Sequence, residues 1–281
     1  MSIIASPATR DRLIIRILLF VLALGFLAIF VLLPLIAIFA EAFRNGAKAY
    51  FEAITNQEAI SAIKLTLLVA AIAVPLNMIF GICASWAITK FEFTGKRFLI
   101  TLIDLPFSVS PVISGLIYVL LFGSHTIFGE WLAKNDIEII FAVPGLVIAT
   151  IFITFPFVAK ELIPLMEEQG SGEEEAAILL GAGGFKTFLY ITLPNIKWGL
   201  LYGVLLCNAR AMGEFGAVSV VSGHIKGLTD TIPLHVEMLY NEYNFVAAFA
   251  VASILTALAL VTIILKSIIE FKFEHSKKKR K

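Results

Sequence analysis

Six long apolar runs, each with at most two charged residues, constrain this chain more than any other feature of its sequence. A helix needs roughly 20 apolar residues to cross the hydrocarbon core of a bilayer. The runs cover residues 17–40, 65–89, 98–122, 139–159, 198–222 and 245–265. Hydrophobic residues make up 59% of the 281 residues and charged residues only 15%, which excludes an ordinary water-soluble domain. The sequence therefore predicts an all-α membrane protein, with six transmembrane helices in a single domain covering residues 1–281.

The positions of lysine and arginine orient these spans, because cytoplasmic segments of membrane proteins carry an excess of both. Arg10, Arg12 and Arg16 precede the first run, and a basic tail, residues 277–281, follows the last. The first run is too long for a secretory signal, whose apolar core is roughly 7–15 residues. We therefore expect both termini in the cytoplasm and the basic tail against membrane lipid. The net charge of +1 gives no reason to expect nucleic acid as a partner.

The predicted cytoplasmic loop 160–197 is acidic, whereas the other inner segments are basic. Ser171 and Glu174 fit a capping box, in which each side chain bonds to the backbone at the start of a helix. Gly181 would end that helix in the left-handed conformation. A second short helix is expected up to residue 191, because Pro194 disfavours a helical residue before it.

These two helices would form a hairpin that presents the apolar residues 178–180 at the cytoplasmic face. Apolar residues in such a place fit a docking site for a partner protein. They equally fit packing beneath the membrane helices. The local signals favour neither interpretation over the other.

The same loop contains a longer pattern: Glu-Ala-Ala, three residues, Gly, nine residues, then Ile-x-Leu-Pro. Its fixed positions are Glu175, Ala176, Ala177, Gly181, Ile191, Leu193 and Pro194. The pattern resembles the EAA loop of the binding-protein-dependent ABC importers of the bacterial inner membrane. The resemblance implies a type I importer permease fold, in which this loop is a coupling helix seated in a groove of a separate ATPase. It also implies two ATPase subunits on the cytoplasmic side.

The chain carries no recognisable nucleotide, metal or nucleophile motif of its own. The segment from Gly181 to Thr187 comes near a phosphate-binding loop, but Phe185 stands where the glycine before the lysine is required. The four histidines are scattered, so no metal site is expected. We therefore expect a non-catalytic subunit that binds no cofactor, with ATP and Mg²⁺ held by the partner ATPase.

Charged and polar residues inside the predicted spans are candidates for a translocation path, because charge within a membrane is costly. Arg210 and Glu214 lie four residues apart in the fifth run and would share one helix face. They either neutralise each other as a structural pair or line the path, where Arg210 would meet an anion. In the third run, Ser108, Ser110 and Ser114 offer neutral donors beside prolines. Each serine fits simple helix packing as well.

A second resemblance concerns the cargo. Residues 207–223 read Cys-Asn-Ala-Arg-Ala-Met-Gly-Glu-Phe-Gly-Ala-Val-Ser-Val-Val-Ser-Gly. This stretch resembles the W-type permease subunits of sulfate and thiosulfate importers, and the likeness extends over nearly the whole chain. It implies a T-type permease as heterodimer partner and a periplasmic sulfate-binding protein that docks on loops 123–138 and 223–244.

Other functions stay open at this point. Molybdate and tungstate permeases share the Gly-Glu-Phe-Gly core, so these oxyanions are an alternative cargo. A secondary anion transporter that works alone, or an enzyme embedded in the membrane, is a further alternative. A secondary transporter would leave the EAA loop without a task. An enzyme would need a set of catalytic side chains at one level of the membrane, and only Arg210 and Glu214 qualify.

Overall fold

The computed structural model describes residues 13–124 and 126–280, and every regular element within these ranges is a helix. The first half contains α1 (Leu13–Leu27), the π-helical turn η2 (Ala28–Leu32), α2 (Leu33–Ala42), α3 (Gly46–Thr55), α4 (Gln57–Lys90), α5 (Lys96–Ser108), α6 (Pro111–Phe122) and α7 (Ile127–Lys134). The second half contains α8 (Val143–Thr154), α9 (Pro156–Gln169), α10 (Gly172–Leu179), α11 (Gly184–Thr187), the π-helical turn η3 (Phe188–Thr192), α12 (Leu193–Met212), α13 (Gly216–Val221), α14 (Ile232–Asn241) and α15 (Phe245–Arg280).

Five helical segments within the described residues are long and apolar enough to cross a membrane. They are Ile15–Ala42, Gln57–Lys90, Val143–Gln169, Gly184–Met212 and Phe245–Ile268. The pair α5 and α6 makes a sixth if the two helices count as one bent span. The chain is therefore a multi-pass membrane protein. Arg10, Arg12 and the side chains of the basic tail, on which the predicted orientation partly rests, lie outside the described residues.

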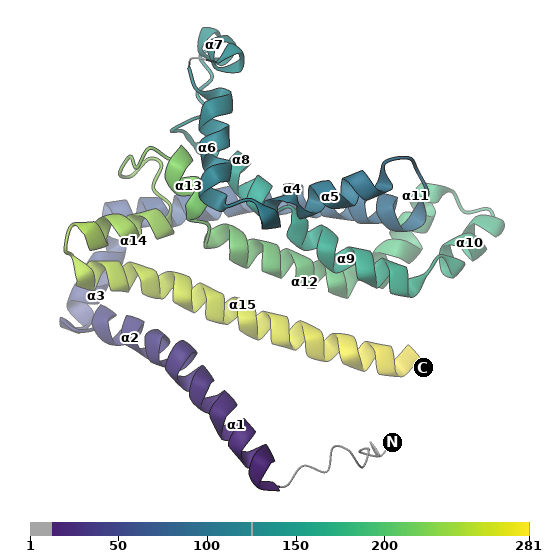
Figure 1. The fold of residues 1–281 in the computed structure, drawn as a ribbon, viewed down its shortest axis with the longest axis horizontal. Helices are drawn as coiled ribbons and strands as arrows, with labels where there is room; N and C mark the ends of the chain where they lie inside the picture. Colours follow the sequence, from purple (N-terminus) through teal and green to yellow (C-terminus); the bar gives the residue numbers. More distant parts are fainter. Residues whose placement is uncertain (1–12, 125, 281) are drawn as a thin grey trace.

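The third apolar run, predicted as one span over residues 98–122, is sharply bent. The axes of α5 and α6 differ by 107°. Pro111 begins α6, and the residue before a proline avoids the helical conformation. Ser110 accordingly has φ −59° and ψ 134°, and Val109 is extended. As a result α6 stands across the common axis of the bundle, with α7 at its tip (Figure 1).

The fifth span is shifted toward the N-terminus relative to the prediction of residues 198–222. Helix continues from α11 through η3 into α12, so the expected stop before Pro194 is wrong. Pro194 lies at the first turn of α12, directly after the wider π-helical turn, where a missing N–H is tolerated. The span ends at Met212, and residues 213–215 separate it from α13.

Helix α4 lies at the centre of the bundle, where it packs against α8, α9 and α12. Its contact with α8 includes a buried polar pair, since Asn77 Nδ2 donates to Thr154 Oγ1 at 2.7 Å. The apolar side chains around this pair, which include Val74, Val158 and Leu162, form one continuous cluster. Helices α4, α8, α9 and α12 therefore share a packed apolar core within this chain.

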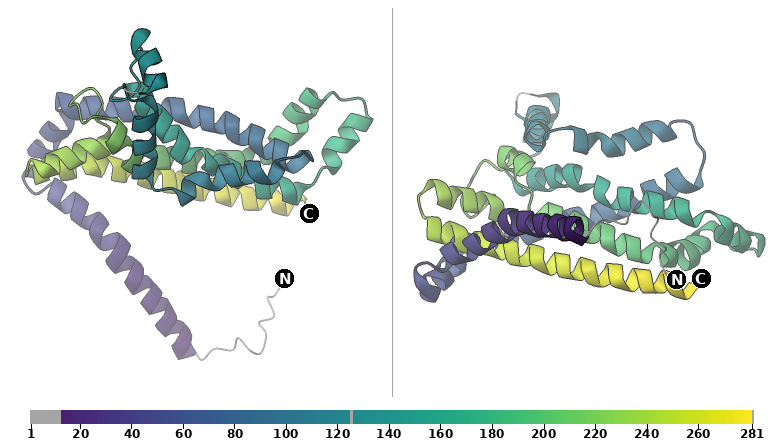
Figure 2. Two further views of the ribbon diagram at one scale, coloured as in Figure 1. Left: turned by 45° about the horizontal axis from the view of Figure 1, so that its top comes forward. Right: turned by 60° about the horizontal axis from the view of Figure 1, so that its bottom comes forward.

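Helix α1 differs from the rest of the chain because none of its spanning window is buried. It leaves the bundle where α2 packs against α15, and it points away from the other helices (Figure 2). Its apolar side chains therefore need lipid or another protein as cover. At the opposite extreme of the molecule, residues 170–187 form a hairpin of α10 and α11, which we call the elbow (Figure 1).

Candidate functional site

Gly181 shapes the tip of the elbow. Its φ of +90° lies in the left-handed region that favours glycine, so the predicted helix end is confirmed. Gly181 N–H donates to Ile178 O at 2.9 Å, and Ala182 N–H donates to Ala177 O at 3.0 Å. This pair of bonds is the Schellman motif, which satisfies carbonyls at the end of α10 and turns the chain sharply.

The start of α10 differs from the predicted capping box. Ser171 does occupy the N-cap, but its hydroxyl bonds no backbone N–H of the helix. It donates instead to the carboxylate of Glu175. Glu174 is engaged in an ion pair with Lys90 of α4. The predicted capping box is therefore wrong, because the Ser171 hydroxyl and the Glu174 carboxylate both bind other side chains instead of the backbone of the helix.

The elbow exposes the apolar residues that the sequence placed at its tip. Leu179 is 87% exposed and Leu180 is 89% exposed, and Ile178 and Phe185 are exposed as well. Packing beneath this chain's own membrane helices is thus contradicted. The remaining pattern positions differ in burial: Ile191 and Leu193 are half-buried where the helix re-enters the bundle, and Glu175, Ala176 and Pro194 are exposed.

Arg210 and Glu214 do meet, although one of them lies outside the helix. Glu214 falls in the turn after α12, and its Oε2 is 2.6 Å from Arg210 Nη1. Its Oε1 accepts a hydrogen bond from Ala217 N–H at 2.9 Å, at the start of α13. Glu214 is 2% exposed, whereas the side chain of Arg210 is 34% exposed. Glu214 thus organises the break in the span and holds a half-exposed arginine beside it.

The three candidate serines lie at the bend of the third span. Ser108 and Ser110 are exposed, whereas Ser114 is buried and donates to Ser110 O at 3.2 Å. Helix α6 packs on α13 there, so close that a Cβ atom built on Gly216 would lie 2.9 Å from Pro111 Cβ. The bend of the third span and the break of the fifth therefore meet. The sequence did not predict this meeting, although small residues on both segments were a signal for it.

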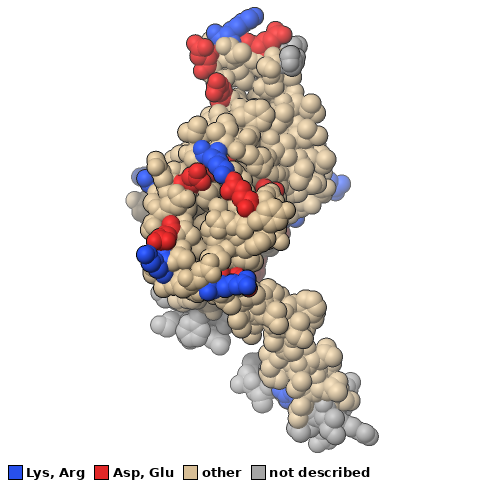
Figure 3. Space-filling view, turned by 90° about the vertical axis from the view of Figure 1, so that its left-hand side faces the viewer, with Lys and Arg blue, Asp and Glu red and all other residues tan. Residues whose placement is uncertain are grey.

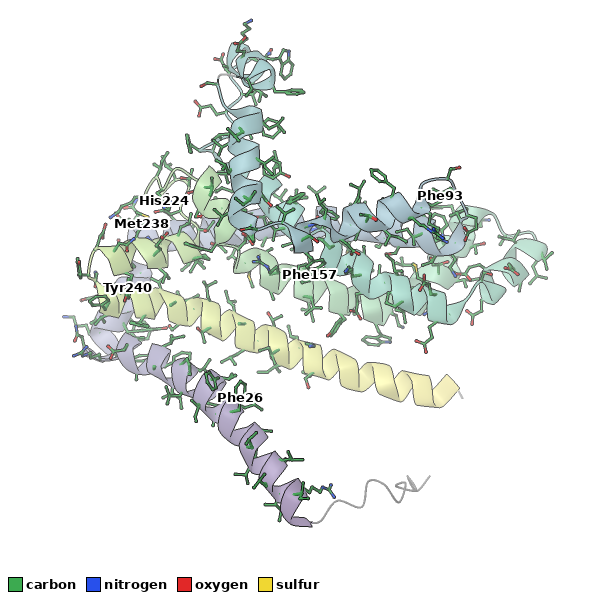
Figure 4. All side chains as sticks on the ribbon, viewed as in Figure 1. Phe26, Phe93, Phe157, His224, Met238 and Tyr240 are labelled. Atoms are coloured by element: carbon green, nitrogen blue, oxygen red, sulfur yellow. The ribbon has the colours of Figure 1, made fainter. Side chains whose placement is uncertain are left out.

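The end of the bundle opposite the elbow carries buried polar residues that were not predicted from the sequence. Figure 4 labels three residues at this end, His224, Met238 and Tyr240. It labels Phe93 near the elbow. Asp230 and His235 are both buried here. Burial raises the pKa of the Asp230 carboxyl, and burial lowers the pKa of His235. The signal for this site was an aspartate directly before a Thr-Ile-Pro helix start.

A cleft of about 860 Å³ opens near the same end, between α6, α7 and the segment that leads to α8. Ile225, from the loop after α13, also lines it. The two loops predicted as docking sites, 123–138 and 223–244, therefore contribute to one concave surface. Figure 3 faces this end of the molecule and shows lysine and arginine beside acidic residues on a mostly uncharged surface. Within residues 13–124 and 126–280 no group of three or more histidine, cysteine or acidic side chains could hold a metal ion.

Comparison with known proteins shows the family to which this architecture belongs. Residues 77–275 match the family described as "Binding-protein-dependent transport system inner membrane component". The chain belongs to this family. Among its relatives, the Sulfate transport system permease protein CysW of Synechocystis sp. is 52% identical over 263 residues, covering 94% of this chain and 95% of that protein. The protein of the same name from Escherichia coli is 48% identical, covering 92% of this chain and 90% of the relative.

Two further comparisons concern a second subunit type and the fold. The Sulfate transport system permease protein CysT of Escherichia coli is 37% identical, covering 86% of this chain and 89% of the relative. A chain in the crystal structure of a bacterial alginate ABC transporter with its alginate-bound periplasmic protein superposes with a TM-score of 0.77. At 17% identity, with 92% of this chain and 94% of that chain covered, this likeness shows the fold alone. The predicted all-α permease fold is confirmed.

Proposed function

We propose that the chain is a membrane-spanning permease subunit of an ATP-driven importer for sulfate and thiosulfate. The observation that carries this proposal is the identity of 52% and 48% to two sulfate permeases over nearly their whole length. The break in the fifth span, where Arg210 pairs with Glu214, meets the serine-bearing bend of the third span through α13 and α6, and this arrangement is consistent with an anion as cargo.

The elbow is the coupling helix of this subunit and docks in a groove of an ATPase. Two leucines that are almost fully exposed at a water-facing tip, Leu179 and Leu180, support this role because a partner would remove them from water. The two ATPase subunits move together when they bind ATP. The elbow transmits that movement to the membrane helices. ATP and Mg²⁺ belong to the two ATPase subunits, and this chain contributes no catalytic residue.

The other partners follow from the surfaces that this chain leaves uncovered. A T-type permease forms the heterodimer, and the unburied apolar length of α1 supports a protein or lipid neighbour there. A periplasmic sulfate-binding protein docks at the opposite end, where the cleft joins both predicted loops. The elbow then faces the cytoplasm of a bacterium, together with both termini.

Arg210, Ser108 and Ser110 line the route between the two permeases, and the buried Ser114, whose hydroxyl donates to Ser110 O, supports the bend behind them. Neutral hydroxyl donors with a single half-exposed cation suit an oxyanion that must bind and then leave, because a wholly cationic site would hold it too tightly. Glu214 keeps that cation partly neutralised.

Competition between oxyanions tests the cargo. The chain is co-expressed with a candidate T-type permease, ATPase and binding protein, and uptake of radiolabelled sulfate into vesicles is measured with an excess of a second anion. The proposal predicts that thiosulfate abolishes sulfate uptake and that molybdate does not. Uptake that molybdate removes and thiosulfate leaves intact would assign the chain to the molybdate and tungstate class instead.

A further inference from the structure

Helix α4 ends in a polar joint at the base of the elbow. Nζ of Lys90, in the last turn of α4, lies 3.0 Å from Oε1 of Glu174, in the first turn of α10. The same ammonium donates to the carbonyl oxygen of Gly170, which caps α9, and the Thr192 hydroxyl donates to Glu174 Oε1 at 3.1 Å. The side chains of Lys90 and Glu174 are only 9% and 14% exposed. The ion pair is thus largely shielded from water and ties four segments together.

Neighbouring hydrogen bonds strengthen the same joint. Asn195 Nδ2 donates to the carboxylate of Glu173, and Gln169 Nε2 donates to Asn195 O at 3.1 Å. Glu173 and Glu174 therefore fasten α10 to the start of α12 and to the end of α4. A charge pair removed from water interacts more strongly than one on an open surface.

Without these contacts α10, the first arm of the elbow, would be joined to the rest of the chain only through glycine turns, whereas the second arm continues as helix from α11 through η3 into α12. Gly170 enters it with φ +68° and Gly181 turns it with φ +90°. A Cβ atom at either glycine would meet nothing within 4 Å, so packing does not hold these turns in place. Such positions are suited to act as hinges. The joint at Glu174 is what fixes α10 to α4 and to the end of α9.

Helix α4 extends this rigid connection to the opposite end of the molecule. There Ile232 N–H, at the start of α14, donates to Thr66 Oγ1 of α4 at 2.8 Å. From Thr66 to Lys90 the helix covers about 36 Å at a rise of roughly 1.5 Å per residue. Along this length α4 packs against α8, α9 and α12. One helix therefore touches the elbow at its inner end and the buried Asp230 region at its outer end.

We infer that Lys90 and Glu174 are positioning residues that transmit movement of the elbow to α4. The inference rests on the proposed function, since the elbow needs an ATPase to move it. Lys90 and Glu174 contact neither ATPase nor cargo in this account. They fix α10, which lies between two glycine turns, to the central helix α4.

The test compares the number of sulfate ions moved with the number of ATP molecules hydrolysed, in the full complex reconstituted with binding protein. Lys90→Met and Glu174→Gln are expected to retain the ATPase and to hydrolyse ATP, while sulfate moved per ATP falls about fivefold or more. Lys90→Arg keeps the positive charge, so it should keep most of the sulfate moved per ATP hydrolysed. The double variant Lys90→Met/Glu174→Gln should move as much sulfate per ATP as either single variant, because each of the three variants removes the same ion pair.

Lys96→Met is the matched control. Lys96 lies at the same end of the bundle and pairs with Glu92 at 2.7 Å, but that pair joins residues four apart within one segment and Glu92 is exposed. Its ratio of sulfate to ATP should equal that of the wild type.

Two results would overturn the inference: a wild-type ratio in both Lys90→Met and Glu174→Gln, or loss of the ATPase from both, which would assign the pair to folding. If the wild-type complex itself moves no sulfate with ATP, the proposed function fails and the inference fails with it.

Discussion

Gly115 of α6 lies so close to Ala217 of α13 that a Cβ atom added at Gly115 would be 2.6 Å from the Ala217 carbonyl oxygen. The same Cβ would be 2.9 Å from Val220 Cβ. Only hydrogen fits at this contact, which joins the bend of the third span to the break of the fifth. The shape of the proposed path therefore depends on a glycine that carries no polar group.

Gly115→Val should destabilise this contact. Inserting methyl groups into a well-packed site costs about 1–3 kcal/mol, and here a backbone carbonyl would have to move. The thermal midpoint of the detergent-purified chain should fall accordingly. Gly25→Val is the control, since a Cβ at Gly25 of α1 meets nothing within 4 Å. Equal midpoints for the two variants would contradict the packing described.

Gly181→Val should abolish association with the ATPase while leaving the chain inserted in the membrane. A β-branched residue is strained by roughly 1–2 kcal/mol at the left-handed φ of +90°, so the elbow would adopt another shape. Co-purification of the ATPase measures the effect. Gly183→Ala, at φ −72° and in open space, should retain the ATPase. Normal co-purification with Gly181→Val would argue against the elbow as the coupling element.

Leu180→Ala should weaken ATPase binding without changing the stability of the chain. The side chain is 89% exposed, so it contributes little to this chain's own core. If it is buried in the ATPase groove, truncation should cost about 1–2 kcal/mol, or roughly tenfold in Kd. Leu228→Ala, an exposed leucine at the opposite end, provides the comparison. Identical ATPase affinities for the two variants would rule out docking through Leu180.

Arg210→Ala should reduce sulfate uptake while the complex still assembles. Arg210 pairs with Oε2 of Glu214, so its removal leaves the hydrogen bond from Ala217 N–H to Glu214 Oε1 in place. Uptake and assembly are measured on the same preparation. A complex that fails to assemble would favour the structural-pair interpretation over a role in the path.

The Asp230 region should make stability depend on pH. Burial raises the Asp230 pKa above its ordinary 3.8, so the folded state holds its proton longer than the unfolded state and stability falls as pH rises through that window. Burial lowers the His235 pKa below 6.5, so its contribution is lost as pH falls through 6.5. The thermal midpoint of Asp230→Asn should therefore rise relative to that of the wild type as the pH is raised from 3.8. A difference independent of pH would contradict this account.

The sequence predicted what depends on local chemistry. Bilayer-length apolar runs located the spans, and the glycine that follows a short helix predicted the left-handed φ of Gly181. The exposure of Leu179 and Leu180 also agrees with the docking interpretation that local signals had left open.

The remaining features depend on contacts between distant segments, which periodicity does not report. Glu174 was predicted to cap its own helix, yet its partner Lys90 is 84 residues away. Pro194 was predicted to stop a helix, but a π-helical turn ahead of it let the helix continue. The prolines beside the serines of the third run indicated an interruption, but periodicity reported neither the 107° angle between α5 and α6 nor the packing of α6 on α13.

The coupling of transport to ATP is measured as accumulation of radiolabelled sulfate in vesicles that contain the complete complex, with and without hydrolysable ATP. Sulfate should accumulate only with hydrolysable ATP, and Gly181→Val should abolish this accumulation. Sulfate uptake by this chain in vesicles that lack the ATPase would contradict this coupling, because the elbow would then have nothing to couple.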